Sequence, residues 1–366
     1  MNKIDQDEIQ ARLTAVRARL SEWQVEGILV SSPENRRWLS GFTGSSGYLL
    51  VTAVHALLAT DFRYYEQAEQ QAPAFTLFKH QRTQADTEKM LETVGVSTMG
   101  FEAESMSVAE ADRLAQVEGV KWTPLPETFE PLRAIKSASE LAKIRAAAAI
   151  TDQVMAQFPA IARPGITELA AAWELEKAMR EAGAEAAAFD VIVASGPNAA
   201  LPHHHPGERL LQTGDAIIVD MGAQVDGYKS DMTRTFFLGE PDEQFWQVYN
   251  VALGAQTAVL QHAKAGMPGQ TVDALARDYI REAGYGDHFG HGLGHSLGLA
   301  IHEAPFLTHL PRGEKYTLEA GMVITIEPGV YLPGWGGVRI EDLVLVTETG
   351  LKAISQCPKN PIIPIS

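Results

Sequence analysis

The first third of the chain alternates between helical and strand-like hydrophobic patterns. Apolar residues recur at three- and four-residue steps over residues 9–23, which is the spacing of one buried helix face. A short apolar run at residues 27–31 follows and predicts a strand, as do residues 48–51 and 56–59. A polar helical stretch around residues 64–71 comes next. These patterns predict mixed α and β structure.

A proline-rich segment separates this part from the rest. Three prolines fall within residues 122–132, and proline, which lacks an amide donor, discourages both helices and central strands. We therefore predict a linker there. Just after it, Ser137 and Glu140 have the spacing of a capping box at a helix start. The chain is predicted to divide into domains at residues 1–131 and 132–366.

The second domain mixes long helical patterns with short strand patterns. The predicted helices cover residues 140–158, 167–182, 243–264 and 270–283. The predicted strands cover residues 189–194, 216–223, 228–237, 322–327 and 338–346. Hairpins are as plentiful as helices, so we expect an α+β fold with a largely antiparallel sheet rather than repeated βαβ units.

Length and charge narrow the class of protein. The 366 residues exceed the roughly 250–300 that one hydrophobic core organises, which agrees with two domains. The 46 acidic against 30 basic residues give a net charge of −16, which repels nucleic acid. The single cysteine, Cys357, excludes an internal disulfide and a cysteine-based zinc site. Without a secretory pattern or an apolar span, we expect a cytoplasmic protein that does not contact a membrane.

The first candidate chemistry lies on a predicted hairpin. Asp226 and Gly227 suit a two-residue type I′ turn, which would place Gly222 opposite Asp231. Because strand side chains alternate, Asp220 then shares a face with Asp231. Two close carboxylates need a proton, a basic side chain or a cation. The hairpin alone fits a solvent-facing Asp231 at least as well as a metal site.

Three histidines lie close together in a glycine-rich stretch. His291, His295 and His302 fall within residues 290–303, where the glycines discourage a helix and suit backbone packed tightly around a site. A lone histidine is usually structural. Three at this spacing favour function, because imidazole is the commonest metal ligand and the usual proton carrier near neutral pH.

Two more carboxylates complete the set. Glu327 ends one apolar strand pattern, and Glu341 interrupts the strand predicted at residues 338–346. A carboxylate within an apolar strand is costly unless it is paired. Arg339, two residues before Glu341 and on the same strand face, could orient it without a metal. Because several such acids gather in one domain, we favour metal ligation.

Charge counting indicates two ions. Asp220, Asp231, Glu327 and Glu341 carry four negative charges, which two divalent cations would neutralise, with His295 as a neutral ligand. Oxygen-rich coordination with one imidazole suits Mn²⁺, with Co²⁺, Zn²⁺ and Fe²⁺ as alternatives. Two such ions about 3.5–4 Å apart bind a water between them and lower its pKa, which produces hydroxide for hydrolysis.

The ordered Asp, Asp, His, Glu, Glu series resembles the pita-bread metallopeptidases, the family of methionine aminopeptidase, aminopeptidase P and prolidase. The resemblance implies that these five residues are the ligands of a dinuclear centre, with Asp231 and Glu341 bridging. Glu327, followed by Pro-Gly as in the family, would also shuttle protons.

The resemblance also implies roles beside the metals. His203, in the run Leu-Pro-His-His-His-Pro-Gly, resembles a histidine on the substrate side, whereas the two histidines after it have no counterpart. His291 and His302 resemble histidines that support the site and contact the substrate, where they would stabilise the tetrahedral intermediate. Arg339 matches an arginine that supports the ligands.

The N-terminal part selects a branch of the family. Residues 35–47 and 60–64 look like the creatinase-type N-terminal domain of aminopeptidase P relatives, although by composition they are only a glycine-rich turn and a charged turn. Methionine aminopeptidases lack such a domain, and creatinase lacks the full ligand set. The expected architecture is a creatinase-type α/β domain followed by a pita-bread catalytic domain, as in compact bacterial Xaa-Pro aminopeptidases.

The expected function is that of a dinuclear-metal Xaa-Pro aminopeptidase. Its substrates would be peptides with proline at the second position, and the resemblance implies a homodimer or a dimer of dimers. An Xaa-Pro dipeptidase, or prolidase, is an alternative that the ligand spacing does not separate. A pita-bread module that binds peptides or proteins without catalysis is another; loss of ligands would mark it, and all five are present.

Overall fold

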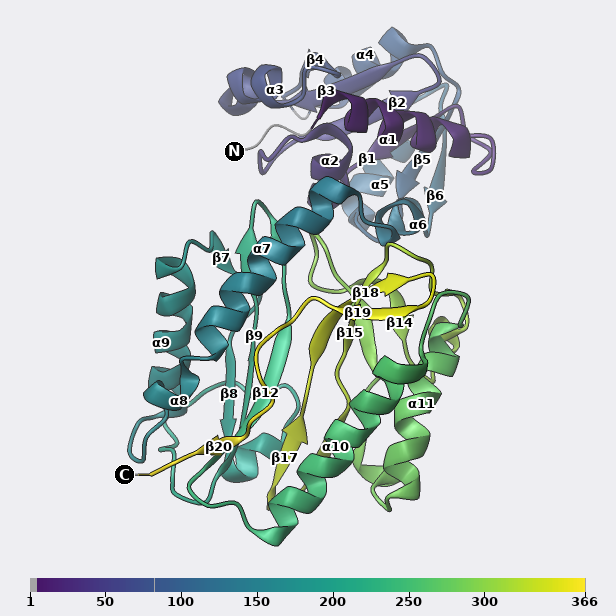
Figure 1. Ribbon diagram of the computed structural model, residues 1–366. Coiled ribbons are helices and arrows are strands. Elements are labelled where there is room, and N and C mark those ends of the chain that lie inside the picture. Colours follow the sequence, from purple (N-terminus) through teal and green to yellow (C-terminus); the bar gives the residue numbers. More distant parts are fainter. Residues whose placement is uncertain (1–4, 82, 366) are drawn as a thin grey trace. The chain divides into compact units, whose positions relative to one another are not determined.

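The computed structural model describes residues 5–81 and 83–365 (Figure 1). The chain forms two compact units, Met1–Leu132 and Arg133–Ser366. Among the described residues, no helix combines the length and the apolar character that crossing a bilayer requires.

The N-terminal unit is built on a six-stranded sheet of order β4-β3-β2-β1-β5-β6. Strands β1, β2 and β3 pair antiparallel, and the three remaining pairs are parallel. The strands are β1 (Gly27–Val30), β2 (Tyr48–Thr52), β3 (Ala56–Thr60), β4 (Thr76–Lys79), β5 (Thr98–Glu102) and β6 (Lys121–Leu125). The helices are α1 (Gln6–Arg19), α2 (Pro33–Ser40), α3 (Tyr65–Gln71), α4 (Gln84–Val94) and α5 (Val108–Ala115).

The predicted linker is partly wrong. Residues 121–125 form β6, which pairs with β5 in parallel and places Pro124 opposite Phe101. This strand lies at the edge of the sheet, where a residue without an amide hydrogen is tolerated because one side of the strand has no partner. A short helix, α6 (Glu130–Ala134), follows it.

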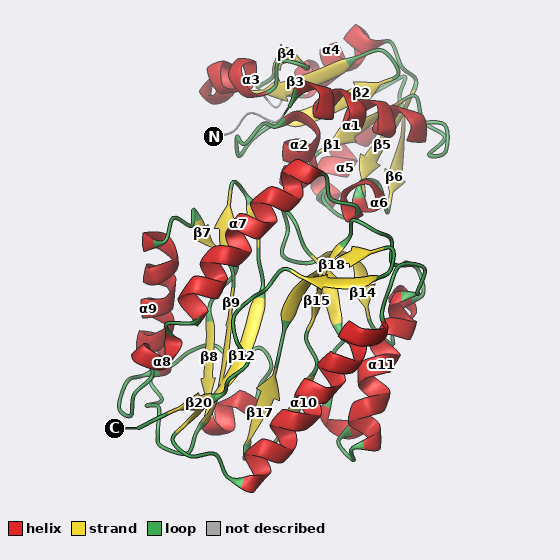
Figure 2. Ribbon diagram, in the orientation of Figure 1, coloured by secondary structure: helices red, strands yellow, loops and turns green. Residues whose placement is uncertain are grey.

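The second unit has two main sheets, each accompanied by helices. Figure 2 shows α7, α8 and α9 beside β8, β9 and β12, and α10 and α11 beside the sheet that holds β15 and β18. The helices are α7 (Ala138–Met155), α8 (Phe158–Ile161), α9 (Glu168–Glu181), α10 (Glu243–His262) and α11 (Gly269–Glu282). Each group packs into its own hydrophobic cluster.

Both main sheets are largely antiparallel, as predicted. One has the order β20-β12-β9-β8, in which only the β12–β20 pair is parallel, and the other has the order β14-β13-β15-β18-β19. The first comprises β8 (Ile192–Ser195), β9 (Ala216–Met221), β12 (Met232–Leu238) and β20 (Ile362–Ile363). The second comprises β13 (Gly294–Ser296), β14 (Glu303–Leu307), β15 (Val323–Ile326), β18 (Asp342–Thr347) and β19 (Gly350–Ala353). A smaller three-stranded sheet comprises β7 (Ala186–Ala187), β10 (Ala223–Val225) and β11 (Tyr228–Lys229). A two-stranded sheet comprises β16 (Gly329–Leu332) and β17 (Gly336–Arg339).

The predicted hairpin register is confirmed. Asp226 and Gly227 have φ values of 45° and 75°, as a type I′ turn requires at both central positions. Asp220 lies opposite Thr233 in the ladder between β9 and β12. A Cβ on Gly222 would lie 1.9 Å from the carbonyl oxygen of Ser230, so the close approach of the two strands at this point requires glycine.

The strand predicted at residues 338–346 is broken. Strand β17 ends at Arg339 and β18 begins at Asp342, so Glu341 belongs to neither. The amide of Glu341 instead donates to the carbonyl oxygen of Thr233 at 3.1 Å. The chain passes at this point from one pair of strands to another, which changes the direction of the Glu341 side chain.

Candidate metal centre

Three buried side chains from separate parts of the second unit converge. Asp231 lies just before β12, His295 lies on β13, and Glu341 lies between β17 and β18. Each offers a ligand atom, and these atoms all lie within 4.8 Å of one another. Glu327, just after β15, adds a further carboxylate, with its Oε1 at 3.5 Å from Nε2 of His295.

The hydrogen bonding of His295 assigns its tautomer. Its Nδ1 lies 3.0 Å from the carbonyl oxygen of Ser296 and must donate, which leaves Nε2 with a lone pair in the neutral ring. Burial lowers the pKa of His295 to about 4, so the ring is neutral at pH 7. Its Nε2 lies 3.7 Å from Oδ2 of Asp231, beyond hydrogen-bond distance. A cation between these lone pairs would turn their repulsion into coordination.

The carboxylates also indicate missing positive charge. Burial, followed by repulsion from neighbouring carboxylates, raises the pKa of Asp231 and of Glu341 well above the usual range. Burial raises the pKa of Glu327 to about 8. Repulsion from Asp220 contributes to all three shifts, so Asp220 belongs to the same cluster.

Unpartnered oxygens show that the donor set fits cations. Among the described side chains, three buried carboxylate oxygens of this cluster make no hydrogen bond: Oδ1 of Asp220, Oδ1 of Asp231 and Oε1 of Glu341. A buried acceptor without a donor is costly, so native proteins rarely retain one without a functional reason. Four carboxylates and one neutral imidazole are the ligands that a pair of divalent cations would take.

Arg339 holds Asp220 rather than Glu341. The buried guanidinium donates from Nη2 to Oδ2 of Asp220 at 2.7 Å and from Nε to Oγ1 of Thr233 at 3.0 Å. The Thr233 hydroxyl in turn donates to Oε2 of Glu341 at 2.8 Å. The sequence suggested that Arg339 orients Glu341 directly. Because the strand breaks before Glu341, the contact runs through Thr233 instead.

His291 is linked to Arg339 through Tyr331. Its Nδ1 lies 2.7 Å from the carbonyl oxygen of Gly292, and its Nε2 lies 2.8 Å from the hydroxyl of Tyr331. The Nδ1 therefore donates, and Tyr331 donates to Nε2 while it accepts from Nη1 of Arg339 at 3.0 Å. Burial lowers the pKa of His291 to about 4, which keeps the ring neutral. Both ring nitrogens are engaged, so His291 orients Tyr331 rather than pointing at a substrate.

His302 and His203 lie on the exposed side of the centre. The His302 ring packs edge-on against His295, with ring centroids 4.5 Å apart. Partial desolvation and then the nearby His203 lower the pKa of His302, and His203 also contributes to the lowered pKa of His291. Both His203 and His302 are exposed. These two imidazoles are therefore placed where a substrate could reach them.

A buried carboxylate fixes the loop that carries His203. Glu168, at the start of α9, is 0% exposed and accepts from Oγ of Ser195 at 2.6 Å and from Nδ2 of Asn198 at 3.0 Å. The ring of His204 lies 2.8 Å from its other oxygen. His204, to which the resemblance gave no role, thus anchors the loop beside His203.

Sequence reasoning missed Thr233, Tyr331 and Glu168. A signal for Thr233 was present, because it follows Asp231 by two residues on the same face of a strand. Tyr331 follows Glu327 by four residues across a strand start, a spacing that indicates no contact. Glu168 resembled an ordinary acidic residue in the first turn of a helix.

The comparisons with known proteins agree with this geometry. The profile of Metallopeptidase family M24 matches residues 142–348, and that of the Creatinase/Prolidase N-terminal domain matches residues 12–135. The chain is 41% identical to the uncharacterized peptidase YqhT of Bacillus subtilis, over 96% of this chain and 99% of that protein.

Two solved structures are similar over nearly their whole length. The Xaa-Pro dipeptidase from Bacillus anthracis is 39% identical, with a TM-score of 0.94 over 97% of this chain and 99% of that one. The X-Pro aminopeptidase from Thermotoga maritima is 33% identical, with a TM-score of 0.86 over 95% of this chain and 100% of that one. The expected creatinase-type domain and pita-bread catalytic domain are confirmed. The chain is therefore a member of metallopeptidase family M24.

Proposed function

We propose that this metallopeptidase is an Xaa-Pro dipeptidase, which hydrolyses the bond before proline in two-residue substrates. Metal-dependent hydrolysis is supported by the buried cluster of carboxylates and one imidazole, in which three carboxylate oxygens have no hydrogen-bond partner. The dipeptide preference is supported by the two solved relatives, because the one named as a dipeptidase is more similar to this chain than the one named as an aminopeptidase.

The N-terminal motifs do not favour an aminopeptidase, contrary to the expectation from sequence. Relatives of both names align over nearly the whole chain, including the N-terminal unit. Within that unit, the buried Arg36 donates to the carbonyl oxygens of Gly44 and Gly47, each at 2.7 Å. Asp61 pairs with Arg63 at 2.7 Å. These contacts lie within the N-terminal unit, which relatives of both names share, so the motifs do not separate the two activities.

The proposed ligands are Asp220, Asp231, His295, Glu327 and Glu341, with Mn²⁺ as the preferred ion. When bound, two divalent cations supply an acidic water near neutral pH and positive charge for the oxygen that becomes negative in the transition state. Asp231, His295 and Glu341, whose ligand atoms lie in one tight group, would form the centre of this ligand set.

In this proposal Glu327 is the carboxylate that moves a proton. Its side chain is 18% exposed and that of Asp220 is 15% exposed, against 7% for Asp231, but Asp220 already accepts a hydrogen bond from Arg339. It would accept a proton from the attacking water and pass it to the proline nitrogen as the peptide bond breaks. The exposed His203 and His302 would donate hydrogen bonds to the substrate.

Arg339 and its partners hold the ligands in place. The guanidinium fixes Asp220 directly and Glu341 through Thr233. Such supporting contacts orient ligands and tune the affinity of a metal site. Tyr331 and His291 extend the network on the other side of Arg339.

Substrate length is tested by comparing kcat/KM for Ala-Pro and Ala-Pro-Ala with the manganese-loaded chain. We expect the dipeptide to be preferred by at least about tenfold, or about 1.4 kcal/mol. Ala-Ala serves as the control for the proline requirement. A clear preference for Ala-Pro-Ala would contradict this proposal and support an Xaa-Pro aminopeptidase instead. Binding of both peptides without cleavage, with two ions bound, would support the non-catalytic alternative.

A further inference from the structure

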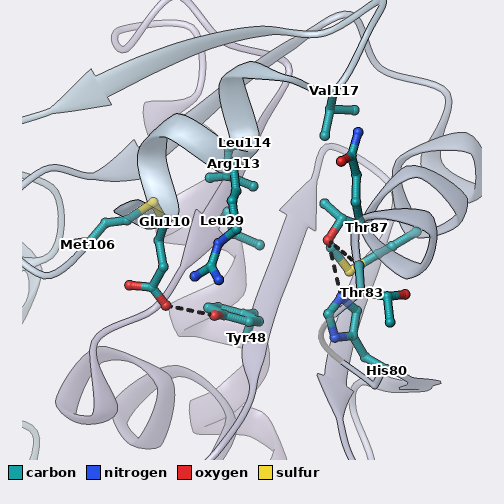
Figure 3. Close-up of a pocket in the computed structure, with 12 residues that line it drawn as sticks. Leu29, Tyr48, His80, Thr83, Thr87, Met106, Glu110, Arg113, Leu114 and Val117 are labelled. Atoms are coloured by element: carbon teal, nitrogen blue, oxygen red, sulfur yellow. Dashed lines mark hydrogen bonds between the residues drawn. The ribbon is translucent and has the colours of Figure 1, made fainter. Parts of the chain in front are cut away.

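A pocket lies within the N-terminal unit, and no residue of the metal centre lines it. It has a volume of about 180 Å³ and lies between α4 and α5 (Figure 3). Leu29 of β1 and Tyr48 of β2 line it from the sheet, and Met90 of α4 and Leu114 of α5 line it from the helices. Part of its lining is therefore apolar and supplied by regular structure.

One side of this pocket carries a carboxylate and a guanidinium. Glu110 and Arg113 lie three residues apart on α5, which places them on the same side of the helix. Glu110 is fixed in place, because Oε1 accepts from the hydroxyl of Tyr48 at 3.1 Å and Oε2 accepts from Oγ of Ser107 at 2.8 Å. The Ser107 hydrogen bond, the largest contribution, lowers the pKa of Glu110, which keeps it ionised near neutral pH.

The guanidinium of Arg113 is available to a ligand. It makes no hydrogen bond and no ion pair with the part of the chain that the structure describes, although it lies close enough to Glu110 to contribute to the lowered pKa of that carboxyl. Figure 3 shows Glu110 and Arg113 on one side of the pocket and His80 and Thr87 on the other. His80 is buried, and its Nε2 lies 3.3 Å from Oγ1 of Thr87.

We propose that this pocket binds a free apolar α-amino acid. The carboxylate of such a ligand would pair with Arg113, whose planar guanidinium suits a carboxylate, and its ammonium group would lie against Glu110. The apolar side chain would pack on Leu29, Met90 and Leu114. A zwitterionic head group matches a carboxylate and a guanidinium on one helix face better than a simple anion, which Glu110 would repel.

The size of the cavity agrees with this ligand class. A cavity of about 150 Å³ lined by aliphatic residues is large enough to bind benzene. The volume of about 180 Å³ therefore accommodates a phenylalanine or leucine side chain. Binding at this site requires no assumption about the substrate of the metal centre.

The ligand class is tested by isothermal titration calorimetry on the full, manganese-loaded chain. The ligands are L-phenylalanine, 3-phenylpropanoate, which lacks the ammonium group, and phenethylamine, which lacks the carboxylate. We expect saturable binding of phenylalanine and at least about tenfold weaker binding of each analogue. No saturable binding of phenylalanine, or equal binding of the three compounds, would overturn the proposal.

Variants distinguish this pocket from binding of the amino acid at the metal centre. Arg113→Gln and Glu110→Gln should each weaken phenylalanine binding at least about tenfold, and glutamine preserves the capping box that starts α5. Lys89→Gln and Glu118→Gln are matched controls, because both residues are exposed and neither lines the pocket. Unchanged affinity in the two pocket variants, or an equal loss in the controls, would place the ligand elsewhere.

Discussion

Replacing Thr233 by valine tests the support of the metal centre. Valine keeps the shape of this fully buried side chain but removes two hydrogen bonds, one to Nε of Arg339 at 3.0 Å and one to Oε2 of Glu341 at 2.8 Å. A hydrogen bond to a charged group contributes about 1.5–3 kcal/mol. Arg339 keeps its other partners, so we expect the free energy of unfolding to fall by about 2–4 kcal/mol.

The larger expected consequence is for the ions. Loss of a residue that orients a metal ligand reduces metal affinity or activity by about 10–100-fold. The assays are denaturant unfolding and manganese titration of the Thr233→Val chain, with turnover of an Xaa-Pro dipeptide measured at saturating metal.

Thr235→Val is the matched control. Thr235 is 2% exposed on the same strand, and within the described residues its hydroxyl bonds only the main chain of Arg339, at 3.0 Å from the amide and 2.8 Å from the carbonyl oxygen. It should lower stability by about 1–2 kcal/mol while leaving metal affinity unchanged. If Thr233→Val bound manganese as tightly as Thr235→Val, the role assigned to the Thr233 hydroxyl would be refuted.

Three further predictions concern the centre itself. Chelation should abolish peptidase activity and Mn²⁺ or Co²⁺ should restore it, with elemental analysis approaching two ions per chain; full activity of the stripped chain would contradict the mechanism. Glu327→Gln should lower turnover about 10²–10⁴-fold while KM changes little, and normal turnover with both ions retained would exclude a proton shuttle. In the metal-free chain, burial raises the pKa of Glu327 from 4.5 to about 8. Between these two pH values the folded chain keeps a proton on Glu327 that the unfolded chain has lost. Stability should therefore fall as the pH rises from about 4.5 to about 8. The fall is measured above about pH 7, where unfolded histidines have lost most of their protons; bound manganese should suppress it in denaturant unfolding, and a rise with pH would show that the shift has the opposite sign.

Local patterns predicted most of the elements of the second unit. The helix expected at residues 243–264 is α10 (Glu243–His262), because its apolar stripe is long and Asp242 caps its start. The hairpin register followed from the turn chemistry of Asp226 and Gly227 alone. Both features depend on residues within a few positions of one another, which a single sequence displays.

The two errors in the strands have a different cause. Whether a proline is tolerated depends on the position of its strand in the sheet, and β6 lies at an edge that only the tertiary fold defines. The break before Glu341 falls between two apolar stretches that the sequence pattern joins into one predicted strand over residues 338–346. The amide of Glu341 donates to the carbonyl oxygen of Thr233, which lies more than a hundred residues earlier in the chain. No local sequence pattern indicates such a distant partner.

The site shows the same division between residue type and placement. The five candidate ligands could be predicted because carboxylates and histidines in apolar or glycine-rich surroundings need a reason to be there. The residues that orient them could not, because a threonine or tyrosine in a strand needs no such reason. His291 illustrates the consequence: its type and spacing indicated a functional role, the resemblance implied that it supports the site or contacts the substrate, and its two hydrogen bonds join it to Gly292 and Tyr331. Residue type and local pattern therefore pointed to the candidate centre. The donor and acceptor at each ring nitrogen, which only the structure supplies, decide what each histidine can do.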